Sequence, residues 1–202
     1  KSCCGKKLCL GCAHAVIEAD KRRLCPFCRA PPFTSDGEEM EITMKRVEAN
    51  DAEAICRLGC DYRDGDMGLP QDYGKAMELF LRAGKLGNAE ANCNIGFAYK
   101  NGRGVETDEK KANYYYELAA IEGDVAARYN LGTNDYVAGN KTRAMKHFMI
   151  SAGAGHDPSL KKIKACFMGG HATKNDFEKA LRDHQASTDE MKSAQRAAAK
   201  QL

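Results

Sequence analysis

Short sequence patterns recur along this chain at intervals of about 36 residues, and this periodicity constrains the fold more than any other feature. A Leu-Gly or Ile-Gly pair recurs at 58–59, 95–96 and 131–132, at intervals of 37 and 36. A basic residue followed by Ala recurs at 75–76, 111–112, 143–144 and 179–180, at intervals of 36, 32 and 36. The first three of these alanines are each followed by a glycine at one fixed distance, at Gly87, Gly123 and Gly155. Three landmarks that share one register predict a tandem array of similar structural units.

Each unit is predicted to be a pair of helices. In the second unit, one face at helical spacing is formed by Ala91, Ile95, Gly96 and Tyr99. The matching face of the next helix is formed by Ala112, Tyr115, Tyr116 and Ala119. Gly96 would let the partner helix approach closely, and Gly123 would end the second helix in a left-handed cap. We therefore expect a mainly α protein, an α-α solenoid of helix pairs.

The letters of the second unit resemble a known family. Its segments follow A-x-x-x-L-G-x-x-Y (with Ile at the Leu position), N-G-x-G-V-x-x-D-x-x-K-A and Y-Y-x-x-A-A-x-x-G, patterns similar to Sel1 repeats, which are close to tetratricopeptide repeats. On this resemblance the array covers 48–187, with units at about 51–87, 88–123 and 124–155 and a degenerate capping unit at 156–187. Asp135 replaces a Tyr of the pattern, and Asp183 and His184 occupy core positions of the last unit.

The Sel1 resemblance also implies a function. Stacked helix pairs form a concave groove, and such families serve as adaptors, so we expect a protein partner to lie in that groove. The alternative is a spacer that binds nothing specific. This expectation is an analogy with the family and does not come from the chemistry of a site.

Six of the ten cysteines are crowded at the start of the chain, at Cys3, Cys4, Cys9, Cys12, Cys25 and Cys28. They include two C-x-x-C units, 9–12 and 25–28. Two residues between thiolates let a tight turn place both sulfurs on one tetrahedral zinc ion. A segment this short cannot bury enough apolar surface to fold without metal. The spacing therefore predicts a Zn²⁺-binding module at 1–32 in a reducing compartment.

The order of these cysteines is similar to ligands three to eight of a RING finger. A RING finger holds two zinc ions with interleaved ligands. On this resemblance the first zinc takes Cys9 and Cys12 together with a C-x-x-C pair upstream of the chain. The second zinc takes Cys4, Cys25 and Cys28. The chain begins with Lys and not with Met, so we expect it to be a fragment that carries only part of the RING.

The fourth ligand of the second zinc is open. Lys6 stands where RING fingers often carry a histidine, and an ammonium group cannot coordinate zinc. The adjacent Cys3 is one substitute, as in RING variants that use eight cysteines. His14 is the other, although we expect it on the short helix that follows Cys12.

RING modules generally act as ubiquitin ligases by positioning a charged conjugating enzyme. The residues that match the family's conjugating-enzyme contacts are Val16, Ile17, Pro26 and Arg29. The resemblance thus implies the substrate-binding part of a RING-type ligase, similar to RING–Sel1 proteins of diatoms and related algae. The alternatives are a zinc-containing scaffold without ligase activity and a repeat protein whose cysteine segment is disordered and metal-free.

Composition bounds the remaining possibilities. The net charge of +3 comes without a clustered basic stripe, which argues against nucleic acid as a partner. No apolar run approaches the roughly 18 residues of a membrane span, so we expect a soluble, cytoplasmic protein. Prolines, turn residues and acids predict a linker and the start of the helical part at 33–47, capped by Ser35 or Asp36. Residues 188–202 are predicted to be a polar tail, helical or disordered.

No enzyme active site is expected in this chain, because nothing in it resembles a nucleophile with its base. Two of the three tyrosines at 114–116 are interpreted as repeat core, since they follow helical spacing. Cys56 and Cys60 lie four residues apart and are interpreted as small core residues, with no histidine or further cysteine near them in the sequence.

Overall fold

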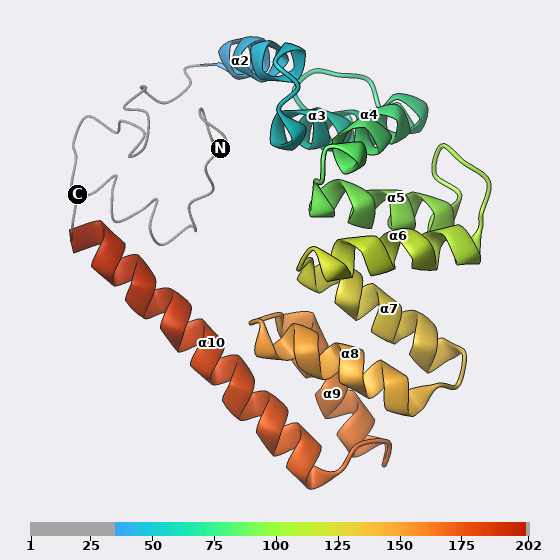
Figure 1. Ribbon diagram of the computed structural model, residues 1–202, viewed down its shortest axis with the longest axis vertical. Coiled ribbons are helices and arrows are strands. Elements are labelled where there is room, and N and C mark those ends of the chain that lie inside the picture. Colours follow the sequence, from blue (N-terminus) through green and yellow to red (C-terminus); the bar gives the residue numbers. More distant parts are fainter. Residues whose placement is uncertain (1–34, 201–202) are drawn as a thin grey trace. The chain divides into compact units, whose positions relative to one another are not determined.

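The computed structural model describes residues 35–200, and these residues form helices joined by short turns (Figure 1). The prediction of a mainly α chain is confirmed for this part. Two compact units are present: the described residues up to Asn88 belong to the first, and Ala89–Met191 form the second. Among the described helices, none is both long and apolar enough to cross a bilayer.

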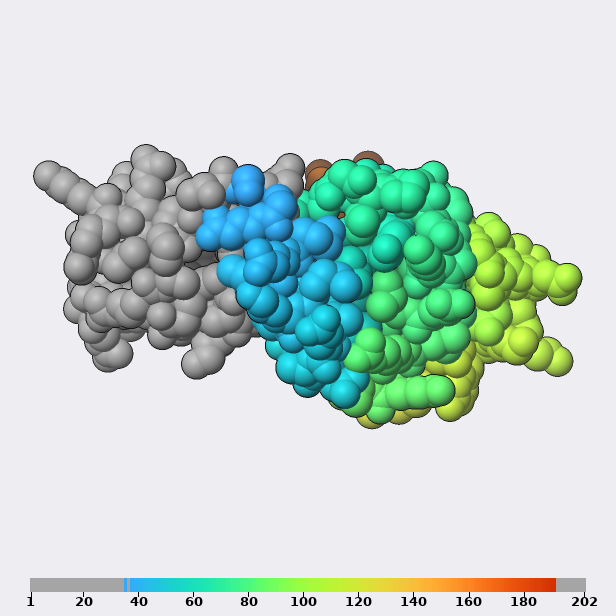
Figure 2. Space-filling model, turned by 90° about the horizontal axis from the view of Figure 1, so that it is seen from above, coloured from blue at the N-terminus to red at the C-terminus, as the bar shows by residue number. Residues whose placement is uncertain are grey.

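The first unit contains three of the described helices: α2 (Asp36–Glu48), α3 (Ala52–Asp64) and α4 (Tyr73–Lys85). Each begins at a side-chain cap, given by Ser35, Asp51 and Asp72. These caps accept hydrogen bonds from amides of the first turn, which have no partner within the helix. Side chains of α2 (blue) lie against those of α3 (blue-green) in Figure 2, and α3 packs along α4.

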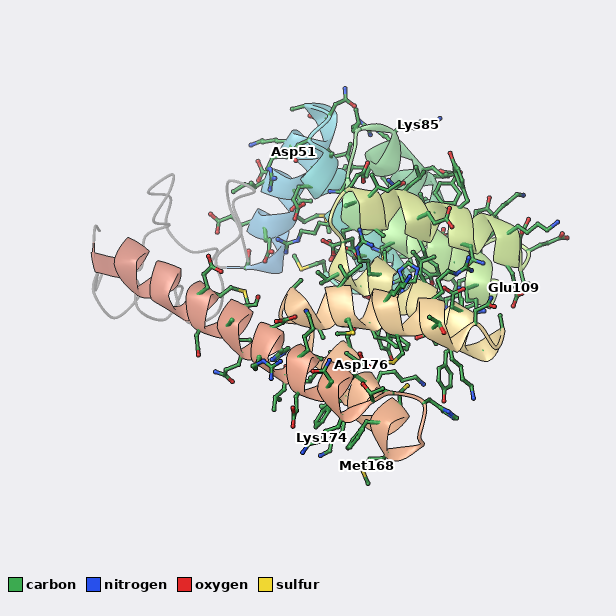
Figure 3. The ribbon with its side chains drawn as sticks, turned by 60° about the horizontal axis from the view of Figure 1, so that its bottom comes forward. Asp51, Lys85, Glu109, Met168, Lys174 and Asp176 are labelled. Carbon is green, nitrogen blue, oxygen red and sulfur yellow. The ribbon has the colours of Figure 1, made fainter. Side chains whose placement is uncertain are left out.

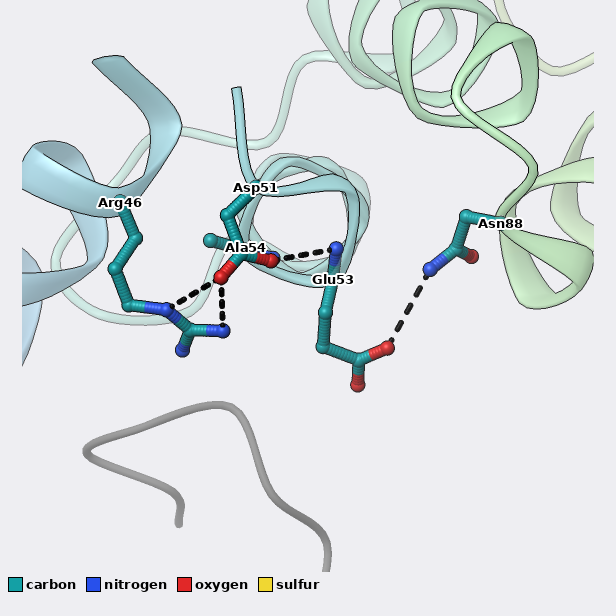
Figure 4. A network of polar contacts seen from close by, with 5 residues as sticks. All are labelled: Arg46, Asp51, Glu53, Ala54 and Asn88. Atoms are coloured by element: carbon teal, nitrogen blue, oxygen red, sulfur yellow. Dashed lines mark hydrogen bonds and ion pairs between the residues drawn. The ribbon is translucent and has the colours of Figure 1, made fainter. Parts of the chain in front are cut away.

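Polar contacts fix the turn between α2 and α3 (Figure 4). Asp51 caps α3 through the amides of Glu53 and Ala54, and its other oxygen accepts from the Arg46 guanidinium at 2.7 and 2.9 Å. These hydrogen bonds lower the pKa of Asp51, although burial opposes them with the largest single effect. The turn includes Asn50 in the left-handed region, at φ 56°. Asparagine tolerates this conformation better than most residues.

The second unit begins with α5 (Ala89–Asn101) and continues through helices that pack in chain order, each against the next. These are α6 (Glu109–Ile121), α7 (Val125–Val137), α8 (Lys141–Gly153) and α9 (Asp157–Met168). The last described helix is α10 (Lys174–Lys200), of which the residues up to Met191 belong to this unit. The tail that we predicted at 188–202 thus begins inside a continuous helix.

Small and aromatic side chains fill the core of the second unit. One cluster joins α6 and α7, through Ala112, Tyr116, Ala119, Ala120, Ala127 and Leu131. Another joins α8, α9 and α10, through Ala144, Phe148, Ala152, Ile163 and Ala180. The landmark alanines of the repeat register, Ala112, Ala144 and Ala180, are all at most 1% exposed. The sequence repeat is therefore a repeat of core positions.

The ends of the second unit's helices also follow the predicted chemistry. Gly123 and Gly155 have φ of 94° and 84°, so the left-handed cap predicted at Gly123 is confirmed. In α10, His184 is 9% exposed and Asp183 is half-buried, where the capping unit was predicted to place polar residues. His184 Nε2 lies 2.9 Å from a carboxylate oxygen of Asp157 in α9, but the two do not form a hydrogen bond.

Candidate protein-interaction surface

All residues predicted to bind zinc or a conjugating enzyme lie before residue 35, outside the described part of the chain. They are Cys3, Cys4, Cys9, Cys12, Val16, Ile17, Cys25, Pro26, Cys28 and Arg29. These assignments therefore stay predictions, and the surfaces of the repeats are what the structure offers for function.

A glycine and an aromatic ring pack tightly against each other in three of the described helix pairs: α3 with α4, α5 with α6, and α7 with α8. A Cβ atom placed on Gly59, Gly96 or Gly132 would lie 2.7 Å from a ring carbon of Phe80, Tyr116 or Phe148, respectively. In each pair the ring lies four residues after the landmark alanine. The predicted close approach at Gly96 is confirmed, and the same device occurs in three successive repeats. Each of these three pairs is therefore closed at one glycine–aromatic contact of its own.

A second position couples the two helices of a pair through charge. In the first two repeats a Lys ammonium lies over a Tyr ring: Lys75 is 5.1 Å from the centre of Tyr62, and Lys111 is 5.2 Å from that of Tyr99. In the third repeat Asp135 replaces the Tyr, and the residue in the Lys position is Arg143. The pairing is kept by different chemistry, because a cation attracts either an aromatic face or a carboxylate.

Asp135 is 5% exposed and pairs with Arg143, whose Nε donates to the carboxylate at 2.7 Å. This hydrogen bond raises the pKa of Arg143. His147 lies one helical turn further along α8, with its Nε2 3.7 Å from Asp135. Burial lowers the pKa of His147 below 6.5, outweighing the opposite effect of Asp135. The sequence flagged Asp135 as a departure from the pattern, but it gave no signal that His147 would join it.

A serine–histidine contact in the second unit does not form a catalytic pair. His156 Nδ1 lies 2.9 Å from Ser159 Oγ, Ser159 donates to Ser151, and Ser151 donates to the carbonyl oxygen of Val125. Because each hydroxyl has a single proton, Ser159 must accept from the histidine and cannot be activated by it. Both serines are fully buried. This chain of hydrogen bonds holds α7, α8 and α9 together.

The tyrosines of α6 give the second unit an exposed aromatic surface. Tyr116 is core at 2% exposed, Tyr115 is half-buried and Tyr114 is 56% exposed. The prediction of two core tyrosines is confirmed fully for Tyr116 and only partly for Tyr115. Tyr115 stacks on Tyr99 with ring centres 5.9 Å apart and meets Tyr114 edge-on at 5.3 Å. We call these three residues, Tyr99, Tyr114 and Tyr115, the tyrosine cluster.

Large apolar side chains also reach solvent at the ends of helices. Ile121 of α6, Val137 of α7 and Met168 of α9 are 76–80% exposed. Met168 extends away from the helices in Figure 3. Single exposed apolar residues are common on soluble proteins. These side chains are free of the core and open to solvent.

Comparisons with known proteins agree with this architecture. The family described as Sel1 repeat matches residues 52–88 and 89–124. A Sel1 repeat protein from Oxalobacter formigenes superposes with a TM-score of 0.64 and 26% identity, covering 76% of this chain. The antigen c5321 of uropathogenic Escherichia coli, which displays an SLR fold, superposes with a TM-score of 0.62 and 28% identity, covering 75%.

The chain spans 64% of the length of the first solved protein and 33% of the second. No curated protein matches the chain. Residues 52–124 therefore match two Sel1 repeats, and the described helices form an array that is similar to these two solved repeat proteins.

Proposed function

We propose that this chain is a protein-interaction adaptor, in which the Sel1 repeats hold a partner protein and do no covalent chemistry. The observation that carries the proposal is the tyrosine cluster, in which Tyr115 contacts both Tyr99 and Tyr114 and the group reaches solvent through Tyr114. Tyrosine offers a large, rigid contact area at a low entropic cost, and it is enriched among residues that dominate binding energy. The hairpins behind it are closed by their own glycine–aromatic contacts, so the platform is preorganised.

The adaptor proposal is tested by photocrosslinking in cells of the source organism. A photoreactive phenylalanine analogue at Tyr114 should give covalent adducts of discrete mass. The same analogue at Lys164, an exposed position on α9, serves as the control for random encounters. Tyr115→Ala, combined with the analogue at position 114, should weaken the adducts because Tyr115 supports the ring beside it. Equal adducts from both positions, or none from either, would refute the proposal.

We further propose that the segment 1–32 binds zinc and that the parent protein is a RING-type ubiquitin ligase whose repeats select substrate. The support for this is the spacing of the two C-x-x-C units and their resemblance to RING ligands. Pro26 and Arg29 would then bind the conjugating enzyme. The full-length parent should build ubiquitin chains with purified conjugating enzymes and lose this activity on Pro26→Ala or Arg29→Ala. No chains with a broad enzyme panel would favour the alternative, a zinc-containing scaffold.

The zinc assignment has its own measurement, which does not depend on ligase activity. This chain should contain close to one zinc ion, because its cysteines complete only the second RING site. Cys25→Ser should abolish this zinc, whereas Cys166→Ser, in the buried core of α9, should leave it unchanged. A metal content that is the same in both variants would contradict the assignment.

A further inference from the structure

In each of the first two repeats, the tyrosine of the pattern is followed by a basic residue, and a carboxylate pairs with that residue. Arg63 lies 2.6 Å from Asp64, and Lys100 lies 3.3 Å from Glu109. In the third repeat the register places Tyr136 where the second has Lys100, and Lys141 where the second has Glu109. The position that carries a carboxylate in the second repeat, Glu109, thus carries an ammonium group in the third, Lys141.

Other cationic or basic groups gather around this exchanged position. Lys141 Nζ lies 3.2 Å from Nε2 of His171, whose ring centre is 6.2 Å from that of Tyr136. The ammonium of Lys162 lies over the Tyr136 ring, 4.7 Å from its centre. We call these four residues, from α7, α8, α9 and the turn before α10, the basic patch. Lys141 and His171 are exposed, and Tyr136 and Lys162 are half-buried.

The charge of the basic patch has no counterpart among the described residues. The structure places no carboxylate of residues 35–191 within 4.0 Å of the ammonium group of Lys141 or Lys162. Lys141 is also the first residue of α8, where the partial positive charge of the helix end disfavours an ammonium group. The cap residue Asn140 makes no side-chain hydrogen bond there. Two independent features, charge exchange and helix position, thus leave this surface short of an anion.

We propose that the basic patch binds an acidic segment, rich in Asp and Glu, of the protein partner. This inference rests on the proposed adaptor function and adds the chemistry of the segment that is recognised. A carboxylate between Lys141 and Lys162 restores the pairing that Glu109 provides in the second repeat. Complementary charge at such a site sets specificity and the rate of association more than raw affinity.

The test uses the whole chain and fluorescein-labelled hexaglutamate, with binding followed by fluorescence anisotropy at low salt. Lys141→Glu/Lys162→Glu is expected to weaken binding about tenfold, because two ion pairs are replaced by repulsions. Lys161→Glu/Lys164→Glu changes the net charge equally on the exposed face of α9 and should weaken binding less than about threefold. Circular dichroism verifies that both variants fold, and Lys141→Met/Lys162→Met replaces the first variant if it does not.

Three results would overturn the proposal: no binding of hexaglutamate by the wild type, equal losses in the patch and control variants, or displacement of the peptide by an equal concentration of inorganic phosphate. Displacement by phosphate would show that the basic patch binds any small anion and does not recognise an acidic segment. Crosslinks from position 114 separate this proposal from the adaptor function. If they persist unchanged in Lys141→Glu/Lys162→Glu while hexaglutamate does not bind the wild type, the adaptor stands and the basic patch fails.

Discussion

Single glycines set the distance between the helices of each pair. Glycine inside a helix costs stability relative to alanine, so a helical glycine that recurs needs a packing reason. At Gly96 two groups leave no room for a side chain: an added Cβ would lie 2.7 Å from the Tyr116 ring and 3.0 Å from the carbonyl oxygen of Ala112. The ring could turn away, but the backbone oxygen cannot move without shifting α6.

Gly96→Ala should therefore destabilise the second unit, by about 1–3 kcal/mol, as expected for overpacking of a well-filled core. The matched control is Gly153→Ala in α8, where the nearest atom to the added Cβ is an Asp183 side-chain carbon at an ordinary 3.7 Å. That change should be neutral or stabilise by up to about 1 kcal/mol through helix propensity. Urea unfolding of both variants measures the difference, and effects of the same sign would contradict the packing argument.

Two histidines of the second unit make its stability depend on pH. Burial lowers the pKa of His147 and of His156 below the ordinary 6.5. The unfolded chain then binds protons at a higher pH than the folded chain, so the free energy of unfolding falls as the pH drops through 6.5. The groups that act on His147 besides burial are Asp135 and Glu117, which raise its pKa, and Arg128 and Arg143, which lower it.

We expect the urea midpoint of the chain to decrease from about pH 7.5 to about pH 5.5, and His147→Gln should make this decrease smaller. Carboxyl groups whose pKa is lowered in the fold, such as Asp108 and Asp176, protonate below 3.8 and do not act in this window. Lys146→Gln, an exposed neighbour on α8, is the control. A midpoint that is flat across the window would show that neither histidine is held neutral by the fold.

The N-terminal caps of the helices differ in their hydrogen bonding along the array. Asp124 begins α7 by accepting from the amide of Ala127 at 2.6 Å. At α8, Asn140 has φ −80° and ψ 56°, and its side chain makes no such bond. The loop before α8 is four residues shorter than the loop of the second repeat, which ends in the capping Asp108.

Asp124→Ala should therefore cost about 1 kcal/mol of stability, the usual value for loss of an N-terminal cap. Asn140→Ala should change stability by less than half of that, since no capping bond is lost. Thermal unfolding measured on the two variants in parallel compares the two helix starts. Equal losses would mean that Asn140 caps α8 in solution after all.

Most helices and core positions of the array could be predicted from the sequence, because helix periodicity and the repeat register depend directly on local structure and burial. Ala112 and Tyr116 followed from spacing alone. The Asp135–His147 contact and the meeting of Lys141 with His171 could not be predicted, since each depends on how separate helices pack. Residues 141 and 171 are 30 apart in the sequence, and no local pattern connects them.

At the scale of the whole molecule, the proposed zinc module and the repeats should be separable in stability. The described core clusters of the second unit are built from residues 112–180, and two of its helix pairs are each closed by a glycine–aromatic contact. A zinc site at the start of the chain supplies folding free energy only to the segment that binds it. The array, in contrast, gains its stability from contacts between neighbouring repeats.

Removing zinc with a chelator should therefore leave hydrogen exchange of residues 89–191 unchanged, while peptides from the segment 1–32 lose any protection that they have. Cys25→Ser should reproduce the effect of the chelator, and Cys166→Ser should leave the exchange of that segment as it is. If chelation instead accelerates exchange in α5–α8, the metal site and the repeats fold as one cooperative body. A ligase built on such a body would couple loss of zinc to loss of its partner, whereas two independent parts would keep the partner bound after the zinc is gone.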